Sequence, residues 1–456
     1  MQALNDFAAQ LSGFLWGLPA IILLVGTGLY LTLKLNFIQF RGFKEAIKIT
    51  SGKYHNKKNE GINHPFKALA ATLSATIGTG NIAGVATAVA LGGPGALFWM
   101  WVTAIVGMAT KYATCTLSIK YRQKLPNGDI TGGPMYVLKN GLNMKWLAIC
   151  YAFFTAVASF GIGSSVQSNS IVSGLQFAFP KLLDHSQLYI GIILAIAVGL
   201  VIIGGVKRIA NVAAVIVPFM MLIYIVAALT VIIVNFTLIP SAFYDIFTMA
   251  FTGSSIAGGG IGAAIRFGVA RGVFSNEAGL GTAGIMHATA VTDNPVRQGL
   301  VAMLGPFIDT IVICTMTGLV IVITGVWSPE LSAGNEGAAM TAYAFTSGLS
   351  VFGIDNFGSR IIGISLFFFA YSTIVSWSYY GNVSVEFLWG KSAILPYKII
   401  FILMVIVGAV FPIQLVWNIA DIMNILMALP NLIALVLMAG FLRKKSKENN
   451  KIIIGK

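Results

Sequence analysis

The stretch Ser74-Ala-Thr-Ile-Gly-Thr-Gly-Asn-Ile-Ala-Gly84 lies in the middle of a hydrophobic segment that otherwise has the character of a membrane-spanning helix. Three glycines among hydroxyl and amide side chains disfavour a helix, because each glycine costs about 1 kcal/mol relative to alanine in a helix interior. A break that faced lipid would leave backbone N–H and C=O groups without partners. The stretch therefore predicts a discontinuous helix that forms a binding site for a solute and a cation.

The composition of the chain also indicates a membrane protein. Of its 456 residues, 57% are hydrophobic and only 10% are charged, with a mean hydropathy of +0.84, whereas soluble domains carry about 25% charged residues. Cys115, Cys150 and Cys314 all lie in apolar segments, which argues against a disulfide framework or a metal site built from cysteines. The first ten residues lack the basic segment of a cleavable signal, so we expect the first apolar run to be retained.

Apolar runs of about 20 residues predict an all-α integral membrane protein with eleven transmembrane helices. A further stretch from Asn335 to Ser347 predicts a short helix outside this count, since it carries few large apolar residues. The eleven predicted spans are Gly13–Leu33, Pro65–Leu91, Pro94–Ile119, Trp146–Phe177, Leu188–Val206, Ile209–Phe236, Ser241–Val269, Gln298–Val326, Ile361–Leu388, Ile394–Phe411 and Leu415–Leu442.

The distribution of basic residues predicts the orientation. If the N-terminus lies outside and the C-terminus in the cytoplasm, 27 of the 29 Lys and Arg residues fall in inner segments, and only Lys181 and Arg360 do not. The positive-inside rule expects this asymmetry. It also accounts for the net charge of +14 without a nucleic-acid partner. We therefore expect a multi-pass protein of a bacterial or archaeal-type plasma membrane.

The spans divide into four predicted parts. An amphipathic helix on the inner membrane surface is expected between Phe37 and Lys58, where apolar and basic residues alternate loosely at helical spacing. The basic tail is a topology anchor. The parts are an N-terminal extra helix with this surface helix (1–64), two five-helix repeats (65–240 and 241–442) and a cytoplasmic tail (443–456).

A second glycine-rich stretch supports the repeat. Gly253-Ser-Ser-Ile-Ala-Gly-Gly-Gly-Ile-Gly262 lies in the predicted seventh span, which opens the second group of five when the first span is set aside. Interruptions at corresponding positions of two halves are typical of an inverted-repeat transporter. The second and seventh helices are thus expected to be discontinuous. The alternative is that these small residues only allow close helix packing.

The two breaks predict how a zwitterion would bind. The freed amides of Thr79, Gly80 and Asn81 would begin a half-helix, and its positive dipole end suits a carboxylate. The carbonyls of Ser74 and Ile77 would end the preceding half-helix and offer oxygen atoms to a hard cation. An ammonium group would be received by the carbonyls of the second break, at Ala257, Gly258, Gly259 and Gly260.

Polar side chains of two other spans could complete the chamber. Gln167 is expected to contact the substrate, and Trp377 could form an apolar wall. Ser372 and Thr373 could supply hydroxyl oxygens to the cation. The alternatives are an interhelical hydrogen bond for the glutamine and bonds back to the i−4 carbonyl for the hydroxyls.

Ionisable residues within the spans are few. Asp309 and Asp421 could pair internally, line the pathway or accept a proton. Arg266, Arg271 and Glu277 would form either a gate salt bridge or a charge cluster at the inner interface. The segment Ile209–Phe236 contains no lysine that could replace a metal cation, which favours Na⁺ over H⁺.

Four motifs carry a resemblance to a known family. The run Gly92-Gly-Pro-Gly-Ala-Leu-Phe-Trp-Met-Trp-Val-Thr-Ala-Ile-Val-Gly107 resembles the signature of the sodium:alanine (alanine or glycine:cation) symporter family, and three further motifs are similar to others of that family. They are Thr76-Ile-Gly-Thr-Gly-Asn-Ile-Ala-Gly84, Gly132-Gly-Pro-Met-Tyr136 and Phe274-Ser-Asn-Glu-Ala-Gly-Leu-Gly-Thr-Ala283.

The resemblance implies a leucine-transporter-like 5+5 inverted repeat with one added N-terminal helix. It also implies cotransport of a small neutral amino acid, such as alanine or glycine, with Na⁺. By the same match, the amides of Thr79 and Gly80 would hold the substrate carboxylate. The shared Na⁺ site would combine the carbonyls of Ser74 and Ile77 with Ser372 and Thr373.

Three classes of function remain to be weighed. A symporter that works by alternating access fits the paired breaks, whereas a passive channel would show rings of carbonyls or charges along a continuous path. An intramembrane enzyme is excluded because the chain has neither a His-Glu-x-x-His motif nor a Gly-x-Ser-x-Gly motif. Alanine, glycine, serine and glutamine all stay candidate substrates, Na⁺ and H⁺ both stay candidate coupling ions, and the oligomeric state stays open.

Overall fold

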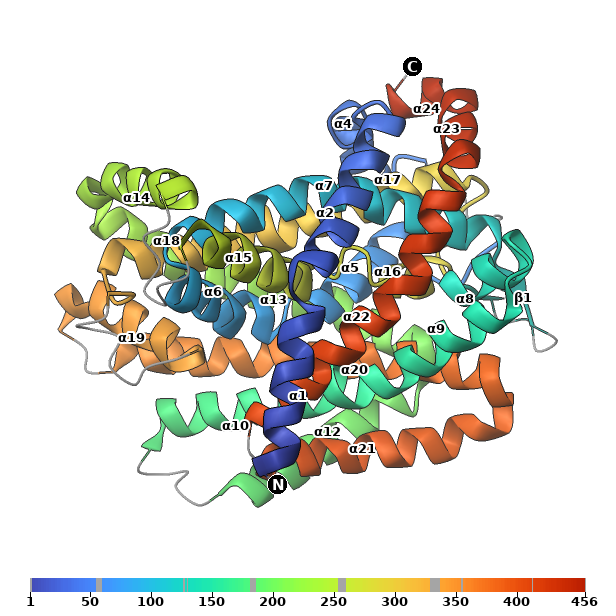
Figure 1. Cartoon of the computed structure of the whole chain (residues 1–456). Coiled ribbons are helices and arrows are strands. Elements are labelled where there is room, and N and C mark those ends of the chain that lie inside the picture. Colours follow the sequence, from blue (N-terminus) through green and yellow to red (C-terminus); the bar gives the residue numbers. More distant parts are fainter. Residues whose placement is uncertain are drawn as a thin grey trace.

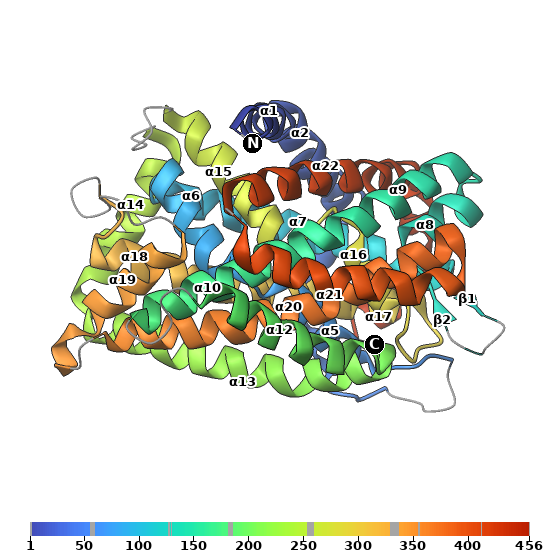
Figure 2. The ribbon, with the colours of Figure 1, turned by 90° about the horizontal axis from the view of Figure 1, so that it is seen from below.

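The computed structural model of the chain describes residues 2–54, 60–125, 128, 130–180, 186–252, 260–328, 337–353, 356–411 and 413–455, without the side chains of residues 2–4, 260 and 413–416. The described part is almost entirely helical. In Figures 1 and 2 most of the long helices lie side by side across the view, with α14, α18 and α19 at one end and α8 and β1 at the other, and α1 and α2 run across them. We call these the α19 end and the β-hairpin end.

The first part of the chain contains most of the turns and both strands. The π-helical segments are η1, η2 and η3, and the two strands pair antiparallel. The elements are α1 (Gln2–Leu15), α2 (Leu18–Lys34), α3 (Ile38–Arg41), α4 (Phe43–Thr50), α5 (Pro65–Thr76), η1 (Gly80–Gly84), α6 (Val85–Gly92), α7 (Gly95–Lys120), β1 (Gln123–Lys124), β2 (Ile130–Thr131), α8 (Pro134–Tyr136), η2 (Val137–Gly141), α9 (Lys145–Ala158), η3 (Ser159–Ser165), α10 (Val166–Ala178), α12 (Gln187–Ile202) and α13 (Gly205–Val234).

The second part is helical throughout its described residues. Its segment η5 is π-helical, and η4, η6 and η7 are single 3₁₀ turns. The elements are η4 (Phe236–Leu238), α14 (Ile239–Thr252), α15 (Gly260–Asn276), α16 (Thr282–His287), α17 (Pro295–Pro306), η5 (Phe307–Cys314), α18 (Thr315–Thr324), α19 (Ala338–Gly348), η6 (Ser350–Phe352), α20 (Phe357–Trp389), η7 (Lys391–Ala393), α21 (Ile394–Val410), α22 (Ile413–Leu437), α23 (Ala439–Glu448) and α24 (Asn450–Ile453).

Several of these helices can cross a membrane. Within the described residues, seven are long and apolar enough, and the number rises to nine if each of two bent pairs counts as one span. The bent pairs are α1 with α2 at 41° and α5 with η1–α6 at 55°. Helix α12 is apolar but shorter. The chain is therefore a multi-pass membrane protein, and the second bent pair contains the break predicted at Ser74–Gly84.

Helix starts and stops follow local sequence. Helices α5 and α17 both begin with proline at the first helical position, where the missing N–H costs nothing. The residues before them cap the helix, because the Phe66 amide donates to His64 Nδ1 at 3.1 Å and the Val296 amide donates to Asn294 Oδ1 at 2.9 Å. Helix α18 ends where Gly325 adopts a φ of +69°, a conformation that glycine adopts without strain.

Burial separates central helices from peripheral ones. In the most apolar window of α7, 89% of the residues are buried, whereas in the span Lys391–Val410 only 28% are. Helix α7 packs against α15 and α17, and α20 packs against α5, α9, α10 and α13. The broken helix α5–α6 thus lies among the most enclosed elements, where protein groups can satisfy its open backbone.

The predicted surface helix near the N-terminus is present as α3 and α4. It packs on the bundle, since Phe43 lies 4.8 Å edge-on from Phe307 and a Cβ at Gly42 would meet Leu300 at 2.4 Å. The short helix predicted from Asn335 to Ser347 corresponds to α19. Residues of both segments are therefore structural parts of the fold.

The predicted seventh span, Ser241–Val269, is wrong in its boundaries. Its first part is the separate helix α14, and α15 continues seven residues beyond the predicted end, to Asn276. Large apolar residues of α14, including Tyr244 and Phe251, are exposed. Hydropathy alone does not distinguish such an exposed helix from the first half of a span, which explains the error.

The charge count also needs correction. Lys111 was counted with the inner segments, but its side chain is buried in the bundle on α7. Arg271 lines a cavity together with Gly337 and Ala338 at the start of α19, so it does not belong with the basic residues of the β-hairpin end. The remaining basic segments, including those around α4, β1 and α23, lie away from the α19 end (Figure 1).

Candidate functional site

The break in the second span is a short unwound joint. Helix α5 ends at Thr76, Ile77 is extended with ψ 91°, and η1 begins at Gly80. The Gly78 amide donates to Asn81 Oδ1 at 2.9 Å, and the Thr79 amide donates to Gln167 Oε1 at 3.2 Å. Two side-chain amides thus satisfy the backbone groups that the break frees, as a membrane interior requires.

The glycines of this joint are required by close packing. A Cβ at Gly78 would lie 2.6 Å from Thr373 Oγ1 and 3.0 Å from Gln167 Oε1. A Cβ at Gly80 would lie 3.0 Å from the Cα of Ser275. The joint is therefore pressed against α10, α15 and α20 at once, and any larger residue would push these helices apart.

The four residues predicted to bind a cation come together at the end of α5. The Ser74 carbonyl accepts from Ser372 Oγ at 3.2 Å and from Thr373 Oγ1 at 3.1 Å, and the Ile77 carbonyl accepts from Thr373 Oγ1 at 3.5 Å. All four residues are buried. The Phe369 carbonyl is within hydrogen-bond distance of both hydroxyls, at 2.9 and 3.1 Å, so the alternative of bonding back within the helix is also observed. A cluster of neutral oxygens suits a hard monovalent or divalent cation.

The structure shows a second joint, between α15 and α16, that the sequence analysis did not place. Residues Glu277 to Gly281 interrupt the helix, with φ of +54° at Glu277, +100° at Gly279 and +90° at Gly281. A left-handed conformation costs a residue with a Cβ about 1–2 kcal/mol, so Glu277 is held there by its surroundings. The signal was the Gly-x-Gly within the motif that ends at Ala283, which was used only for the family resemblance.

The break predicted at Gly253–Gly262 cannot be matched to this joint. Ala257, Gly258 and Gly259 lie outside the described residues, and Gly260 is the first residue of the continuous helix α15. The two helices with joints nevertheless meet, because Gly80 lies against Phe274 and Ser275 near the end of α15. The carbonyl end of α15 therefore faces the start of η1.

Glu277 of the second joint binds neutral donors. Its carboxylate accepts from Trp377 Nε1 at 2.9 Å and from Thr282 Oγ1 at 2.6 Å, and the residue is buried. The predicted gate salt bridge with Arg266 or Arg271 is wrong for this residue. Trp377 is fully buried, and Gly163 packs on it so closely that a Cβ there would lie 2.5 Å from its Cβ. Trp377 thus anchors the second joint, and its role as a wall of the substrate chamber stays a prediction.

Asp309 links three helices at the other side of the first joint. It lies on the π-helical segment η5, is fully buried, and accepts from Asn81 Nδ2 at 2.7 Å. It also accepts from Ser275 Oγ at 2.8 Å and Thr310 Oγ1 at 2.7 Å. π-helical segments often occur at functional sites, and here η1 and η5 meet through the Asn81–Asp309 contact. Asn81 is therefore positioned by a carboxylate, with its oxygen turned to the Gly78 amide.

A cavity of about 690 Å³ opens toward the α19 end and is lined by α6, α10, α19, α20 and α22. Two of its lining residues, Arg271 and Asp421, form an ion pair at 3.1 Å. The guanidinium carbon lies 5.6 Å from the Phe274 ring and 5.2 Å from the Trp417 ring, which are 4.9 Å apart. Asp421 therefore pairs internally, as one alternative for it had suggested. This plug of ions and rings lies between the cavity and Gly80, which contacts Phe274.

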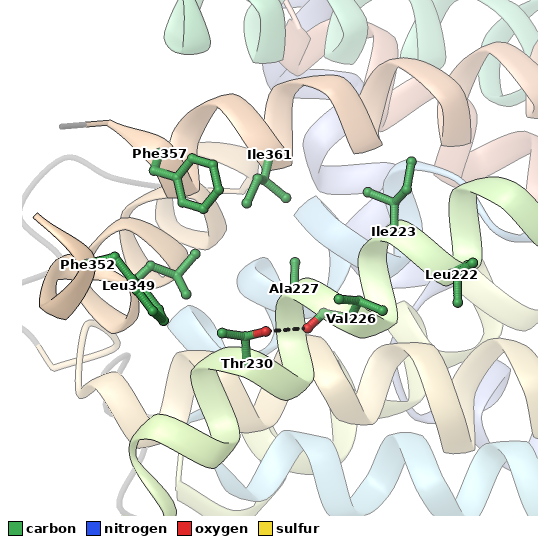
Figure 3. Close-up of a pocket in the computed structure, with 9 residues that line it drawn as sticks. All are labelled: Leu222, Ile223, Val226, Ala227, Thr230, Leu349, Phe352, Phe357 and Ile361. Atoms are coloured by element: carbon green, nitrogen blue, oxygen red, sulfur yellow. Dashed lines mark hydrogen bonds between the residues drawn. The ribbon is translucent and has the colours of Figure 1, made fainter. Parts of the chain in front are cut away.

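A second cavity, of about 460 Å³, has a different character (Figure 3). Its one hydroxyl, Thr230 Oγ1, donates to the Val226 carbonyl at 2.8 Å. Such a groove offers hydrocarbon surface and no group for the ends of a zwitterion. It is lined by Leu222, Ile223, Val226, Ala227 and Thr230 of α13 and by Leu349, Phe352, Phe357 and Ile361 near η6 and α20.

Comparisons with known proteins agree with this architecture. Residues 1–452 match the family described as the sodium:alanine symporter family. The sodium/alanine symporter AgcS of Methanococcus maripaludis is 47% identical over 445 residues, which cover 97% of this chain and 96% of that protein. An uncharacterized transporter of Haemophilus influenzae is 46% identical over 98% of this chain and 96% of its own length, and the probable sodium/glutamine symporter GlnT of Bacillus subtilis is 38% identical over 96% and 89%.

Among solved structures, MhsT in complex with L-phenylalanine superposes with a TM-score of 0.62 at 13% identity, covering 83% of this chain and 89% of that one. A manganese transporter of Eremococcus coleocola reaches 0.51 at 13% identity, over 85% and 80%. At such identities the likeness shows a common transporter fold. The family match covers nearly the whole chain, and the relatives it resembles are transporters and not enzymes. The chain therefore belongs to the sodium:alanine symporter family.

Proposed function

We propose that the protein is a secondary active symporter that imports a small neutral amino acid, alanine or glycine, together with Na⁺ by alternating access. The observation that carries this proposal is the adjacency of two groups at one joint. The oxygens of Ser74, Ile77, Ser372 and Thr373 converge at the end of α5, and the amide of Thr79 opens η1 next to them. Cation and carboxylate would thus bind on opposite ends of the same break.

At the proposed cation site, only the hydroxyl groups of Ser372 and Thr373 would have to rotate for an ion to bind. The hydroxyls of Ser372 and Thr373 now donate to carbonyls, and rotation about their C–O bonds would turn their lone pairs toward an ion. Neutral oxygen ligands leave the charge of a monovalent ion uncompensated within the cluster. A negative substrate group or a nearby carboxylate would stabilise it, which would couple ion binding to amino-acid binding.

The substrate end follows from the donors at the joint. A substrate carboxylate would accept from the amides of Thr79 and Gly80, taking the place that Gln167 Oε1 holds at Thr79. Charge-assisted hydrogen bonds are about twice as strong as neutral ones, so the carboxylate would displace the glutamine oxygen, which could then bind elsewhere on the substrate. Asn81 would hold the joint in place from the other side.

The ammonium group of the substrate would bind at the second joint. The last carbonyls of α15 carry the negative end of the helix dipole, and they face Gly80 through Phe274 and Ser275. The carbonyls of Ala257, Gly258, Gly259 and Gly260 remain the alternative for this role; the first three lie outside the described residues, and Gly260 begins α15. The close packing of Gly78, Gly80 and Gly163 against their neighbours supports a small substrate, alanine or glycine.

The arrangement also supports the proposed topology. Adding α12 and the α15–α16 pair to the nine candidate spans gives eleven, and ten of them would form a 5+5 inverted repeat after the α1–α2 helix. The basic segments at the β-hairpin end would face the cytoplasm. The Arg271–Asp421 plug would then close the outer side of the site.

Uptake in proteoliposomes tests the proposal. Purified protein should accumulate radiolabelled alanine against its gradient when Na⁺ is imposed outside, and not when H⁺ replaces it. Glycine, serine and glutamine serve as competitors, and glutamine matters because one relative is named a probable sodium/glutamine symporter. Accumulation driven by an H⁺ gradient alone would refute Na⁺ symport, and so would alanine that only equilibrates across the membrane despite an Na⁺ gradient. Stronger competition by glutamine than by alanine or glycine would refute the choice of substrate.

A further inference from the structure

A polar cavity of about 560 Å³ lies where α2 ends, and none of its lining residues belongs to either joint. Helix α2 packs against α23 there, and α23 packs against α24. Figure 1 shows these elements together near the C-terminus. The cavity is lined by Leu33, Lys34, Leu35 and Asn36 at the end of α2, by Arg41 of α3, and by Arg443, Ser446, Lys447 and Asn450 of α23 and α24.

Positive charge dominates this cavity. Four of its nine lining residues are cations, and none of the nine is an aspartate or a glutamate. Cations held close together repel one another, so an anion that binds between them would relieve this repulsion. The four cations come from three helices, and they are Lys34 of α2, Arg41 of α3, and Arg443 and Lys447 of α23.

The glutamates that lie close by in the sequence are paired elsewhere. Glu45 pairs with Lys48 at 3.0 Å, and Glu448 pairs with Lys445 at 2.6 Å. Within the part of the chain that the structure describes, none of the four cavity cations forms an ion pair. Their charges are thus available to an anion from outside the chain.

The cations are placed where one phosphate group can reach several of them. Arg443 and Lys447 are four residues apart on α23, so they lie on one face of that helix, and both are exposed. Arg41 donates from one terminal nitrogen to Asn450 Oδ1 and from the other to the Asn36 carbonyl at 3.4 Å, which holds its guanidinium at the cavity. The guanidinium has further N–H groups that remain for a ligand.

Apolar surface continues from the cavity along α2. The bent pair α1–α2 is a candidate membrane span, and Lys34 is its last residue, so the cavity lies at the depth of the lipid headgroups. Leu33, which lines the cavity, is 58% exposed, and Leu29, one helix turn earlier, is 50% exposed. This change from cations to hydrocarbon within one turn suits a molecule with an anionic head and acyl chains.

We propose that this cavity binds the headgroup of an anionic phospholipid. Its phosphate would lie between Arg41, Arg443 and Lys447, and its acyl chains would lie along the exposed face of α2. Basic pockets between membrane-spanning helices on the cytoplasmic side are typical sites for anionic headgroups. The bound lipid would link α2 to the C-terminal helices, whichever solute the protein carries.

The positive-inside rule alone does not account for this arrangement. The rule requires basic residues in inner segments, but it does not require them to converge on one cavity. Lys44 and Lys444 are exposed basic residues of the neighbouring helix α4 and of α23, yet neither lines the cavity. They therefore supply a matched control in which the same charge is removed beside the cavity.

Native mass spectrometry of the full-length protein in detergent measures lipid binding directly. The probes are phosphatidylglycerol and phosphatidylcholine with the same acyl chains, and the choline cation of the second cancels its phosphate charge. We expect phosphatidylglycerol to bind the unmodified protein about tenfold more tightly. Arg41→Gln with Arg443→Gln should weaken this binding by roughly tenfold or more, because each basic residue near an anionic lipid contributes about fivefold. Lys44→Gln with Lys444→Gln should stay within about twofold of the unmodified protein.

Three results would overturn the proposal. Equal losses in the two double variants would show a general attraction of the basic surface, and equal binding of the two lipids would show that the headgroup charge is not recognised. Displacement of phosphatidylglycerol by millimolar inorganic phosphate would assign the cavity to a soluble anion instead of a lipid.

A second variant guards against misfolding, since Arg41→Gln also removes the bond to Asn450. Arg443→Gln with Lys447→Gln removes the same charge, and within the described residues neither side chain forms an ion pair. This variant should lose phosphatidylglycerol binding to a similar extent. Full binding by a folded Arg443→Gln/Lys447→Gln variant would also overturn the proposal.

Discussion

Two carboxamide side chains organise the first joint residue by residue. The side-chain oxygens of Gln167 and Asn81 accept hydrogen bonds from the backbone amides of Thr79 and Gly78. The NH₂ group of each side chain donates to a further residue. Gln167 Nε2 donates to the Ile162 carbonyl at 3.1 Å, and Asn81 Nδ2 donates to Asp309 at 2.7 Å. The oxygens are therefore aimed before any ligand arrives, so a carboxylate that replaces one of them finds oriented donors.

Gly78→Ala tests how tightly the joint is packed. The new Cβ would lie 2.6 Å from Thr373 Oγ1, which would displace that hydroxyl from the Ser74 and Ile77 carbonyls. We expect Na⁺-driven alanine uptake to fall more than tenfold, with the protein still present in the membrane. Gly26→Ala is the matched control, since its Cβ would meet nothing within 4 Å. Equal uptake by the two variants would contradict the packing argument.

Removal of the two hydroxyls on α20 tests the cation cluster. Ser372→Ala with Thr373→Ala deletes two of the proposed oxygen ligands, so the Na⁺ concentration for half-maximal uptake should rise by tenfold or more. The control is Ser378→Ala, a buried serine of the same helix whose hydroxyl donates to the Val375 carbonyl. An unchanged Na⁺ dependence in the double variant would show that these hydroxyls are structural.

Most of the elements that meet at the site are irregular helices, and α20 is the continuous one. Segments η1, η3 and η5 are π-helical, and two helices are interrupted by joints, between α5 and η1 and between α15 and α16. Each irregularity frees backbone groups or turns side chains inward, and neighbouring helices supply the partners. Leu280 O accepts from Tyr151 at 3.1 Å, and Gly279 O accepts from Asn431 at 2.8 Å. The second joint is thus held by α9 and α22.

Gly281→Ala tests the second joint. The residue has a φ of +90°, and a Cβ would meet Pro134 at 2.6 Å and Tyr151 at 2.7 Å. We expect a loss of about 2–3 kcal/mol of stability, from backbone strain plus overpacking, seen as a lower unfolding temperature in detergent. Gly325→Ala has the strain of φ +69° but nothing within 4 Å, so it should lose only about 1 kcal/mol. Similar losses for both would argue against a tightly packed joint.

At the scale of the whole molecule, charge and shape divide the bundle into two ends. The cavity is lined by α19 and by the Arg271–Asp421 plug, whereas the basic segments around α4 and α23 lie away from the α19 end (Figure 1). The apolar groove of Figure 3 lies between α13 and α20, apart from both joints. The cavity at one end is thus separated from Gly80 by the Arg271–Asp421 ion pair and its rings, and alternating access would require this plug to open.

The proposed orientation can be measured by labelling introduced cysteines in intact cells. Tyr244→Cys on α14, where 70% of the tyrosine is exposed, should react with a membrane-impermeant maleimide, and Lys451→Cys on α24 should react only after the cells are opened. The three native cysteines are buried or partly buried, so the unmodified protein is the background control. The reverse pattern would place the N-terminus in the cytoplasm.

The sequence by itself determined those features that depend on local composition. Hydropathy identified a multi-pass helical membrane protein, because about 20 apolar residues are needed to cross a bilayer. The glycines between Ser74 and Gly84 located the first joint, because each glycine in a helix interior lowers the stability of the helix. The proposed cation ligands Ser74, Ile77, Ser372 and Thr373 could be named in advance, and the structure brings all four together.

Only the tertiary structure decided where the second helix is interrupted and which charges act on each other. The predicted break at Gly253–Gly262 lies mostly outside the described residues and stays a prediction, whereas the structure shows a joint at Glu277–Gly281, where one of the left-handed residues is not a glycine. The left-handed backbone of this joint is stabilised by contacts with Trp377, Thr282 and Tyr151. These residues lie on α20, α16 and α9, and their approach depends on the tertiary fold. For the same reason, only the packing of α7 shows that the Lys111 side chain is buried within the bundle.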